Sequence, residues 1–242
     1  MLIILEKGKD AAKLVFKYYT NSIKPVEQSS ITKFNMSQQI NTLIFDLGGV
    51  LIDWNPLYVF NKVIPDQEKR NYFFEHVCPY HWNEQQDAGT PIAQATAERI
   101  ALFPEWEYEI SAYYGQWVEM LGEPFHGTVE ILKKAIDSPD YRVYALTNWS
   151  AETIPIAKTL ERFQFLHWFE GILVSGEEFM LKPQPEIYET ILTRYNIDRT
   201  KAVFIDDNIK NIVGSKAVGL EAIHFQSSEL LAEEFAKLGI KL

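Results

Sequence analysis

Side chains that could take part in catalysis follow four apolar runs that lie far apart in the chain. Asp46 comes directly after Leu-Ile-Phe, and the adjacent acids Asp206 and Asp207 come directly after Ala-Val-Phe-Ile. Thr147 follows Tyr-Ala-Leu, and Lys182 comes eight residues after Ile-Leu-Val. Each residue alone has an ordinary explanation as a helix cap, a turn residue or a solvated charge. Their occurrence together at four run ends indicates a functional site.

The acidic members of this set are typical of a magnesium site. Three carboxylates, from Asp46, Asp206 and Asp207, with a backbone carbonyl and water give the all-oxygen ligands that Mg²⁺ prefers. Two adjacent acids after an apolar run repel each other unless a cation lies nearby. Lys182 can supply that positive charge.

The remaining groups suit transfer of an anionic group. The Thr147 hydroxyl and the Asn148 amide or backbone can bind anion oxygens, and Lys182 can clamp the same anion. Asp46 can act as a carboxylate nucleophile and form an aspartyl-phosphate. A metal ion together with the lysine would stabilise charge on the transferred group.

The pattern of apolar runs and helical stretches around these groups indicates an α/β fold. The apolar runs are continuous rather than alternating, as expected for parallel strands that are buried on both faces. Helical patterns separate the last four runs, which predicts a Rossmann-like, doubly wound parallel sheet. In such a sheet the carboxyl ends of the strands form the binding crevice. We predict strands at 42–45, 143–146, 172–174, 202–205 and 222–225, and helices at 151–163, 185–195 and 208–217.

The domain organisation follows from the long gap after the first strand. Residues 55–126 are rich in aromatic residues and predict a helical cap, with one helix near 92–103 and another near 113–121. The α/β core domain then comprises 42–54 and 127–242 and resumes with a helix at 127–137. Residues 1–41 are polar and rich in helix breakers, and predict a weakly ordered extension in which Met36 is an alternative start.

Composition and charge exclude several classes of partner. The net charge of −10 argues against nucleic acid, because a phosphate backbone requires a surplus of Lys and Arg. The one cysteine, Cys78, excludes an internal disulfide and is expected to be a buried, inert thiol. The apolar start of the chain is too short for a signal sequence or a membrane span, so we expect a cytoplasmic protein with no membrane partner.

Four segments resemble, in order, the motifs of the haloacid dehalogenase-like hydrolase superfamily. They are FDLGGVLID at 45–53, LTN at 146–148, KPQPEIY at 182–188 and FIDDN at 204–208, and the resemblance covers about residues 42–225. It implies a Rossmann-like core with a helical cap between the first two motifs, in agreement with the predicted insert.

The resemblance also implies roles for single residues. Asp46 would be the nucleophile, Thr147 would bind the phosphoryl group and Lys182 would stabilise it. The implied Mg²⁺ ligands are Asp46, Asp206, Asp207 and the carbonyl of Gly48.

Gly48 is where the sequence departs from the family pattern. Phosphatases of the family usually have a second Asp there, which serves as acid and base for the leaving group. The sequence is most similar to the sugar-phosphatase subgroup that resembles bacterial α-glucose-1-phosphate phosphatases, which implies that activity survives the glycine. The proton would then come from water, from a cap residue or from Asp53, for which a turn or capping role is the more ordinary explanation.

One cap segment, HWNEQQDAGT at 81–90, resembles the part of the cap that faces the active site in relatives. Trp82 and Gln86 are predicted to bind substrate, with His81 and Asn83 as further candidates. The alternative is that Trp82 packs within the cap and that the other three are solvated.

The sequence therefore predicts a Mg²⁺-dependent phosphatase that acts on a small phosphate ester, such as a sugar phosphate. The alternatives are a metal-independent 2-haloacid dehalogenase, a mutase and a weakly active binding protein that keeps the fold. Asp206 and Asp207 argue against the dehalogenase, and the glycine at 48 argues against the mutase. A receiver domain of a signalling system also combines these residue types, but there the acidic pair precedes the phosphorylated Asp.

Overall fold

The computed structural model describes residues 39–242, and all structural statements below refer to them. The predicted N-terminal extension, apart from 39–41, and the alternative start at Met36 lie outside the described residues. Within 39–242, no helix combines the length and the apolar character that crossing a bilayer requires.

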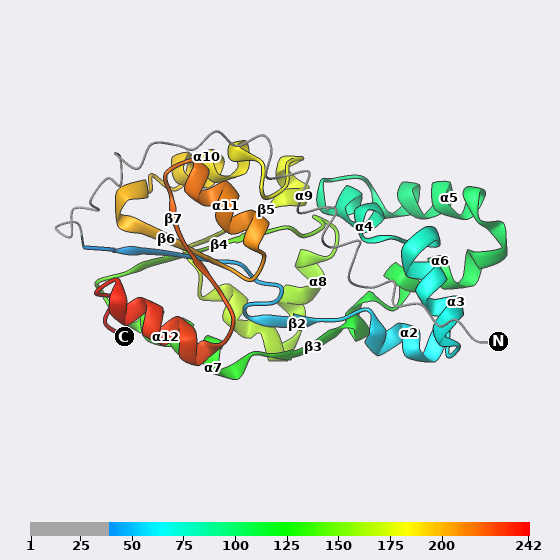
Figure 1. The fold of residues 1–242 in the computed structure, drawn as a ribbon, viewed down its shortest axis with the longest axis horizontal. Helices are drawn as coiled ribbons and strands as arrows, with labels where there is room; N and C mark the ends of the chain where they lie inside the picture. Colours follow the sequence, from blue (N-terminus) through cyan, green and yellow to red (C-terminus); the bar gives the residue numbers. More distant parts are fainter. Residues whose placement is uncertain (1–38) are drawn as a thin grey trace, which may run out of the picture. The chain divides into compact units, whose positions relative to one another are not determined.

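A five-stranded parallel sheet forms the centre of the core, as predicted (Figure 1). Its strand order is β5-β4-β1-β6-β7, so β1 lies in the middle and pairs with β4 on one side and β6 on the other. The continuous aliphatic runs form these strands because both faces of the sheet are covered. The strands are β1 (Thr42–Phe45), β4 (Arg142–Thr147), β5 (Gly171–Val174), β6 (Ala202–Asp206) and β7 (Glu221–His224).

Two layers of helices cover the sheet. On one face, α10 (Pro185–Arg194) and α11 (Ile209–Ala217) pack on strand residues such as Ile44 and Phe204. On the other face, α7 (His126–Asp137) and α12 (Ser228–Lys237) lie side by side, and residues of α8 (Ile154–Thr159) join the same core. Figure 1 shows these layers on opposite sides of the strands.

A short antiparallel ribbon, which the sequence did not predict, connects the core to the helical insert. It consists of β2 (Ile52–Trp54) and β3 (Leu121–Pro124), and Ile52 pairs with Pro124. The chain leaves the core along β2 and returns along β3. Both connections of the insert therefore belong to one ribbon.

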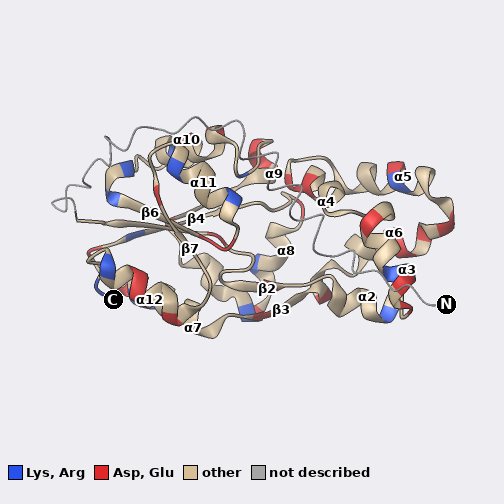
Figure 2. Ribbon diagram, viewed as in Figure 1, with Lys and Arg blue, Asp and Glu red and all other residues tan. Residues whose placement is uncertain are grey.

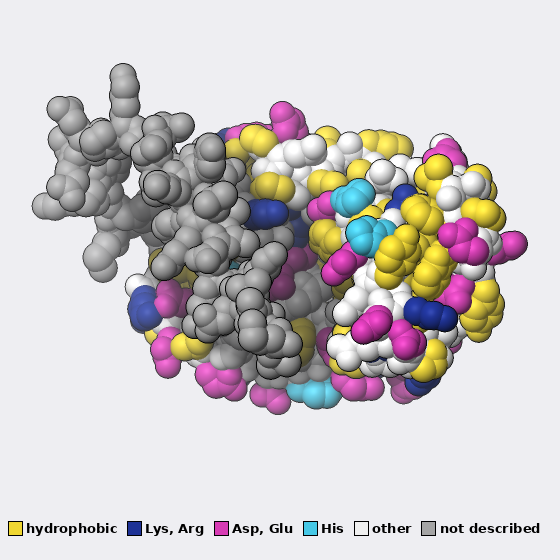
Figure 3. All heavy atoms as spheres, turned by 45° about the vertical axis from the view of Figure 1, so that its right-hand side comes forward, with side chains coloured by type: hydrophobic (Ala, Val, Ile, Leu, Met, Phe, Trp, Pro, Cys, Tyr) yellow, Lys and Arg dark blue, Asp and Glu magenta, His cyan; other side chains and the backbone are white. Residues whose placement is uncertain are grey.

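The insert between β2 and β3 has a hydrophobic core of its own. Phe60 and Phe73 stack at its centre, with ring centroids 4.8 Å apart, and both side chains are fully buried. Figure 3 shows hydrophobic and acidic side chains interspersed on the surface of this part. Its elements are α2 (Leu57–Val63), α3 (Gln67–Tyr72), η1 (Phe73–Val77), α4 (Tyr80–Asp87), α5 (Ile92–Leu102), η2 (Pro104–Trp106), α6 (Glu107–Gly115) and η3 (Trp117–Met120).

Cys78 lies in the hydrophobic core of the insert, as predicted. It is 2% exposed, and burial raises the pKa of its thiol to about 12. The thiol is therefore protonated and inert at neutral pH.

Two predicted helices differ from the observed elements, and a further observed helix was not predicted. The helix predicted at 151–163 is the six-residue α8, which has Pro155 in its first turn and ends before Leu160, where the backbone becomes extended. The helix predicted at 113–121 is instead the end of α6, the 3₁₀ turn η3 and the start of β3. The helix α12, whose N-terminus is capped by Ser227, was not predicted from the sequence.

Replacing Phe204 by Ala should destabilise the folded protein. Phe204 is fully buried in β6 and meets the ring of Tyr188 edge-on, so its truncation leaves a cavity at the centre of the sheet. We expect a loss of about 3–5 kcal/mol in the free energy of unfolding, measured by urea denaturation. Phe179→Ala is the matched control, because Phe179 is 75% exposed and should cost only about 0.5 kcal/mol. Equal losses in both variants would contradict this assignment of the core.

Candidate active site

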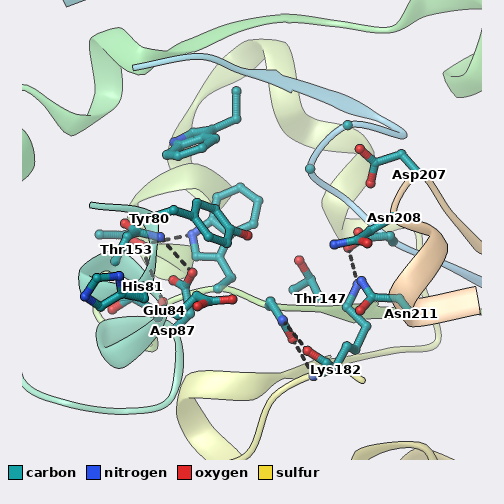
Figure 4. A pocket seen from close by; sticks show the side chains of 18 of the residues that line it. Tyr80, His81, Glu84, Asp87, Thr147, Thr153, Lys182, Asp207, Asn208 and Asn211 are labelled. Atoms are coloured by element: carbon teal, nitrogen blue, oxygen red, sulfur yellow. Dashed lines mark hydrogen bonds and ion pairs between the residues drawn. The ribbon is translucent and has the colours of Figure 1, made fainter. Parts of the chain in front are cut away.

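A cavity of about 640 Å³ lies at the carboxyl ends of the strands and is lined by residues of both the core and the cap. Figure 4 shows Thr147, Lys182 and Asp207 on its core side and Glu84 and Asp87 on its cap side. The cavity therefore lies at the strand ends, where the catalytic groups were predicted.

Lys182 connects two of the predicted acids. Its ammonium lies 2.8 Å from Asp46 Oδ1 and 2.7 Å from Asp206 Oδ2, and it donates to the Leu146 carbonyl at 3.1 Å. Its side chain is 1% exposed. The register of the sheet produces this arrangement, because β1 lies between β4 and β6 and the backbone N–H of Asp46 bonds the Ile205 carbonyl.

The protonation states of Lys182 and Asp46 depend on one another. Burial disfavours the charge of Lys182, but the carboxylates of Asp206 and Asp46 outweigh it and hold the pKa of the ammonium above its usual value. Burial raises the pKa of Asp46, while the Lys182 charge opposes that shift. A divalent cation beside these carboxylates favours their ionised forms.

Asp206 is held by further bonds that sequence reasoning missed. It accepts hydrogen bonds from the Asn208 backbone N–H at 2.7 Å and from the Asn211 amide at 3.0 and 3.1 Å. Asn211 lies in the first turns of α11, so the helix that follows β6 fixes the carboxylate. The asparagine five residues after Asp206 was the available sequence signal.

The three acids meet at one point, and their chemistry fits a divalent cation. One carboxylate oxygen each from Asp46, Asp206 and Asp207 lies within 4.8 Å of the others. Three carboxylates and the Lys182 ammonium leave two negative charges uncompensated, which matches the charge of Mg²⁺. The set contains only hard oxygen ligands, as Mg²⁺ prefers.

The loop after Asp46 brings the backbone close to these acids. Gly49 has φ +74°, which favours glycine, and a Cβ at this position would overlap the Asp207 carboxylate. Gly48 differs, because its φ is ordinary and a Cβ there would meet no atom within 4 Å. Only the second glycine is required by the turn, and the place of the missing Asp side chain is open.

Asn148, which was predicted to bind anion oxygens through its amide or its backbone, lines the cavity and is hydrogen-bonded to the backbone of Lys182. Its amide donates to the Lys182 carbonyl at 3.0 Å and accepts from the Lys182 N–H at 2.9 Å. This pair occupies the side chain and fixes the backbone of Lys182. Thr147, at the end of β4, lines the cavity as predicted.

Trp82 and Gln86, which were predicted to bind substrate, do not line the cavity. Trp82 is 4% exposed and packs edge-on against Tyr113, and Gln86 is fully buried and accepts a bond from Tyr114. Both side chains lie on the face of α4 that is buried in the cap, and they therefore pack inside the cap. The neighbouring candidates His81 and Asn83 do line the cavity.

Asp53 is also outside the cavity lining. Its carboxylate accepts a hydrogen bond from the Tyr58 hydroxyl in the ribbon region. This contact agrees with a local structural role.

Sequence reasoning missed Asp87, which connects the cap to the core. Its carboxylate accepts a hydrogen bond from the Ser150 backbone, and its carbonyl accepts one from the Ser175 hydroxyl. Burial and the neighbouring Glu84 charge raise the pKa of Asp87 to about 7, against the effect of the Ser150 bond. Asp87 thus ties the end of α4 to the loop that follows Thr147.

The family is shown by comparison with known proteins. Residues 43–225 match the model of the haloacid dehalogenase-like hydrolase family. The chain belongs to this family, which confirms the resemblance seen in the sequence.

Two curated relatives are phosphatases by name. A sesquiterpene phosphatase of Aspergillus oryzae is 26% identical over 223 residues, which cover 84% of this chain and 98% of that protein. A pyrophosphatase of Bacillus cereus is 27% identical over 188 residues, which cover 75% of this chain and 81% of that protein.

Solved structures share the fold at low identity. A family enzyme of Bacteroides thetaiotaomicron has a TM-score of 0.65 at 23% identity and covers 81% of this chain and 98% of its own. A complex of the same enzyme with magnesium and inorganic phosphate has a TM-score of 0.60 at 24% identity and covers 78% and 95%. The L-2-haloacid dehalogenase of Xanthobacter autotrophicus with bound chloropropionic acid has a TM-score of 0.56 at 14% identity and covers 84% and 85%.

Gly49→Ala should weaken the binding of Mg²⁺. The new Cβ requires a strained φ and displaces the Asp207 carboxylate, so one ligand moves. We expect an affinity about 10–100-fold lower, measured by isothermal titration calorimetry with MgCl₂. Gly115→Ala is the control, because a Cβ at Gly115 meets no atom within 4 Å. Wild-type affinity in Gly49→Ala would contradict the placement of Asp207 in the metal site.

The free energy of unfolding should depend on pH because of Asp87. Its folded pKa lies above that of the unfolded chain, so between about pH 4 and pH 7 the folded state holds a proton that the unfolded state has lost. The free energy of unfolding should therefore fall as the pH rises through this window, and the fall should be smaller in Asp87→Asn. Urea denaturation in EDTA at several pH values measures the difference. Identical pH dependence in wild type and variant would rule out the raised pKa.

Proposed function

We propose that the protein is a Mg²⁺-dependent phosphatase that releases phosphate from a small phosphorylated metabolite through an aspartyl-phosphate on Asp46. The observation that carries this proposal is that carboxylate oxygens of Asp46, Asp206 and Asp207 lie within 4.8 Å of one another beside the cavity, with Lys182 joined to two of these acids. Sugar phosphates are among the substrates that such a cavity accommodates.

In the proposed reaction, some residues of the site hold the metal ion and others contact the phosphoryl group. Asp46, Asp206, Asp207 and the Gly48 carbonyl would hold Mg²⁺, which supplies positive charge that stabilises the transferring phosphoryl group. Lys182 adds a second positive charge, and the Thr147 hydroxyl binds a phosphoryl oxygen. Fixed charges of this kind need no reorganisation during the reaction.

Asp46 performs the covalent step. Its carboxylate oxygen forms a bond to phosphorus while the ester P–O bond breaks, and the leaving oxygen takes the electron pair. Water then attacks the aspartyl-phosphate, which frees inorganic phosphate and restores the carboxylate. The bonds from Lys182 and from the Leu47 N–H, at 2.8 and 2.7 Å, hold this carboxylate in position.

The relatives and the cavity support a phosphatase for small substrates. Both curated relatives described above are named as phosphatases, although their substrates differ. A volume of about 640 Å³ lies in the range typical of small-molecule sites. On the cap side, His81 and Asn83 take the substrate-facing positions that were predicted for Trp82 and Gln86.

The acidic pair disfavours dehalogenation of a 2-haloacid. Asp206 is ion-paired with Lys182 and hydrogen-bonded by Asn211, and Asp207 adds a further negative charge to the cavity that Asp46 lines. A carboxylate substrate without a metal ion would be repelled there. The structural likeness to haloacid dehalogenases concerns the fold.

Asp46→Asn should abolish phosphate release. The amide cannot form the acyl-phosphate, so kcat/KM on p-nitrophenyl phosphate with MgCl₂ should fall at least about 1,000-fold. EDTA should remove the wild-type activity, and added MgCl₂ should restore it. Asp140→Asn, at an exposed position outside the cavity, is the matched control.

Three results would contradict the proposal. Full phosphate release in EDTA would remove the role of the metal. Metal-independent release of chloride from 2-chloropropionate would replace the phosphatase with a dehalogenase, and absence of both activities on a broad panel of esters would favour a binding protein.

A further inference from the structure

The proposed reaction leaves one requirement unmet on the core side of the cavity. When the ester bond breaks, the leaving oxygen needs a hydrogen-bond or proton donor. Gly48 has no side chain, and the space that a Cβ would take there is open to 4 Å. A side-chain donor must therefore be another group that lines the cavity.

Apart from the nucleophile, three titratable groups that line the cavity are already bonded to neighbouring residues, whereas His81, Glu84, Asp207 and Lys210 line it without such bonds among the described residues. Lys182 bridges Asp46 and Asp206. The Asp87 carboxylate is bonded by the Ser150 N–H and the Asn83 amide, and the Tyr114 hydroxyl bonds Asn83 and Gln86. Those bonds direct both groups toward the cap and the loop.

Tyr80 differs from these groups. It is the first residue of α4, lines the cavity and is 60% exposed, whereas most aromatic rings of the cap are packed inside it. Within residues 39–242, no hydrogen bond of its hydroxyl is present. Figure 4 places it on the cap side of the cavity, with Glu84 and Asp87.

Tyr80 lines the same cavity as Asp46 and Lys182 of the core and Glu84 and Asp87 of the cap. The charges of these four groups all act on the Tyr80 hydroxyl. The phenol of the cap and the proposed nucleophile of the core therefore line one cavity.

We propose that the Tyr80 hydroxyl donates to the leaving oxygen of the substrate and thereby supplies the function that the glycine at 48 lacks. This assignment rests on the proposed phosphatase function. As the P–O bond breaks and Asp46 bonds to phosphorus, the phenol O–H passes its proton to the leaving oxygen, which departs as an alcohol. The phenolate regains a proton from water.

The protonation state of Tyr80 suits a donor. Partial burial and the charges of Asp87, Glu84 and Asp46 raise its pKa to about 12, and the Lys182 charge opposes this shift only in part. The hydroxyl is therefore protonated throughout the neutral range and has a proton to donate.

Tyr80→Phe tests the proposal with two esters that share the phosphoryl group. Glycerol 1-phosphate has a poor alkoxide leaving group and requires a donor, whereas p-nitrophenyl phosphate has a good leaving group and does not. We expect kcat/KM to fall about 100-fold for glycerol 1-phosphate and less than about threefold for p-nitrophenyl phosphate. The parameter kcat/KM is the relevant one because it includes the step that expels the leaving group.

Two further variants complete the test. Tyr108→Phe makes the same chemical change at a cap position that is 66% exposed and outside the cavity, and should leave both values unchanged. Gly48→Asp in the Tyr80→Phe background should restore part of the glycerol 1-phosphate activity, because the open space admits a carboxyl group beside the leaving oxygen. Far-UV circular dichroism checks that each variant is folded.

The possible outcomes separate this proposal from the proposed function. Equal losses on both esters would make Tyr80 a binding group, and no loss on either would leave it without a role; both results overturn the donor assignment while the phosphatase stands. Wild-type protein that releases no phosphate from either ester with MgCl₂ would overturn both. Selective loss on glycerol 1-phosphate in Asp87→Asn, with Tyr80→Phe unaffected, would transfer the donor role to Asp87.

Discussion

The ammonium of Lys182 between the carboxylates of Asp46 and Asp206 is the contact on which the site depends. Three charged groups are buried together here, and none of them would be stable in the interior alone. The sheet provides the positions, because the central strand delivers one acid and its neighbour delivers the other at the same edge. Asn148 fixes the backbone of the lysine, and Asn211 fixes the second acid, so the charges are held by hydrogen bonds as well as by attraction.

Around this contact the backbone provides the remaining features of the site. The left-handed conformation of Gly49 lets the loop pass close to Asp207. The cap adds an exposed phenol, which the core lacks, because the core side of the cavity carries acids and the lysines Lys182 and Lys210. In the proposed reaction, the phosphoryl end of a substrate and its leaving end would therefore meet different parts of the protein.

Much of the fold and of the core side of the site could be predicted from the sequence. The aliphatic runs and the order of their terminal residues predicted the parallel sheet, because the strand ends must share one edge. The cap side could not be predicted equally well. Whether Trp82 or Tyr80 faces the cavity depends on the rotation of α4, and the helix has apolar or aromatic residues on more than one face. The ribbon was missed because strands of three and four residues have too little periodicity to be recognised.

That ribbon has a consequence for how the protein is assembled from parts. Because Ile52 pairs with Pro124, the two ends of the insert lie next to each other, and a short turn could close the gap if the insert were absent. The insert also has its own apolar interior. The insert could therefore be exchanged for another without disturbing the core sheet. Such an exchange would change which substrates the enzyme accepts, while the charged centre in the core stays the same.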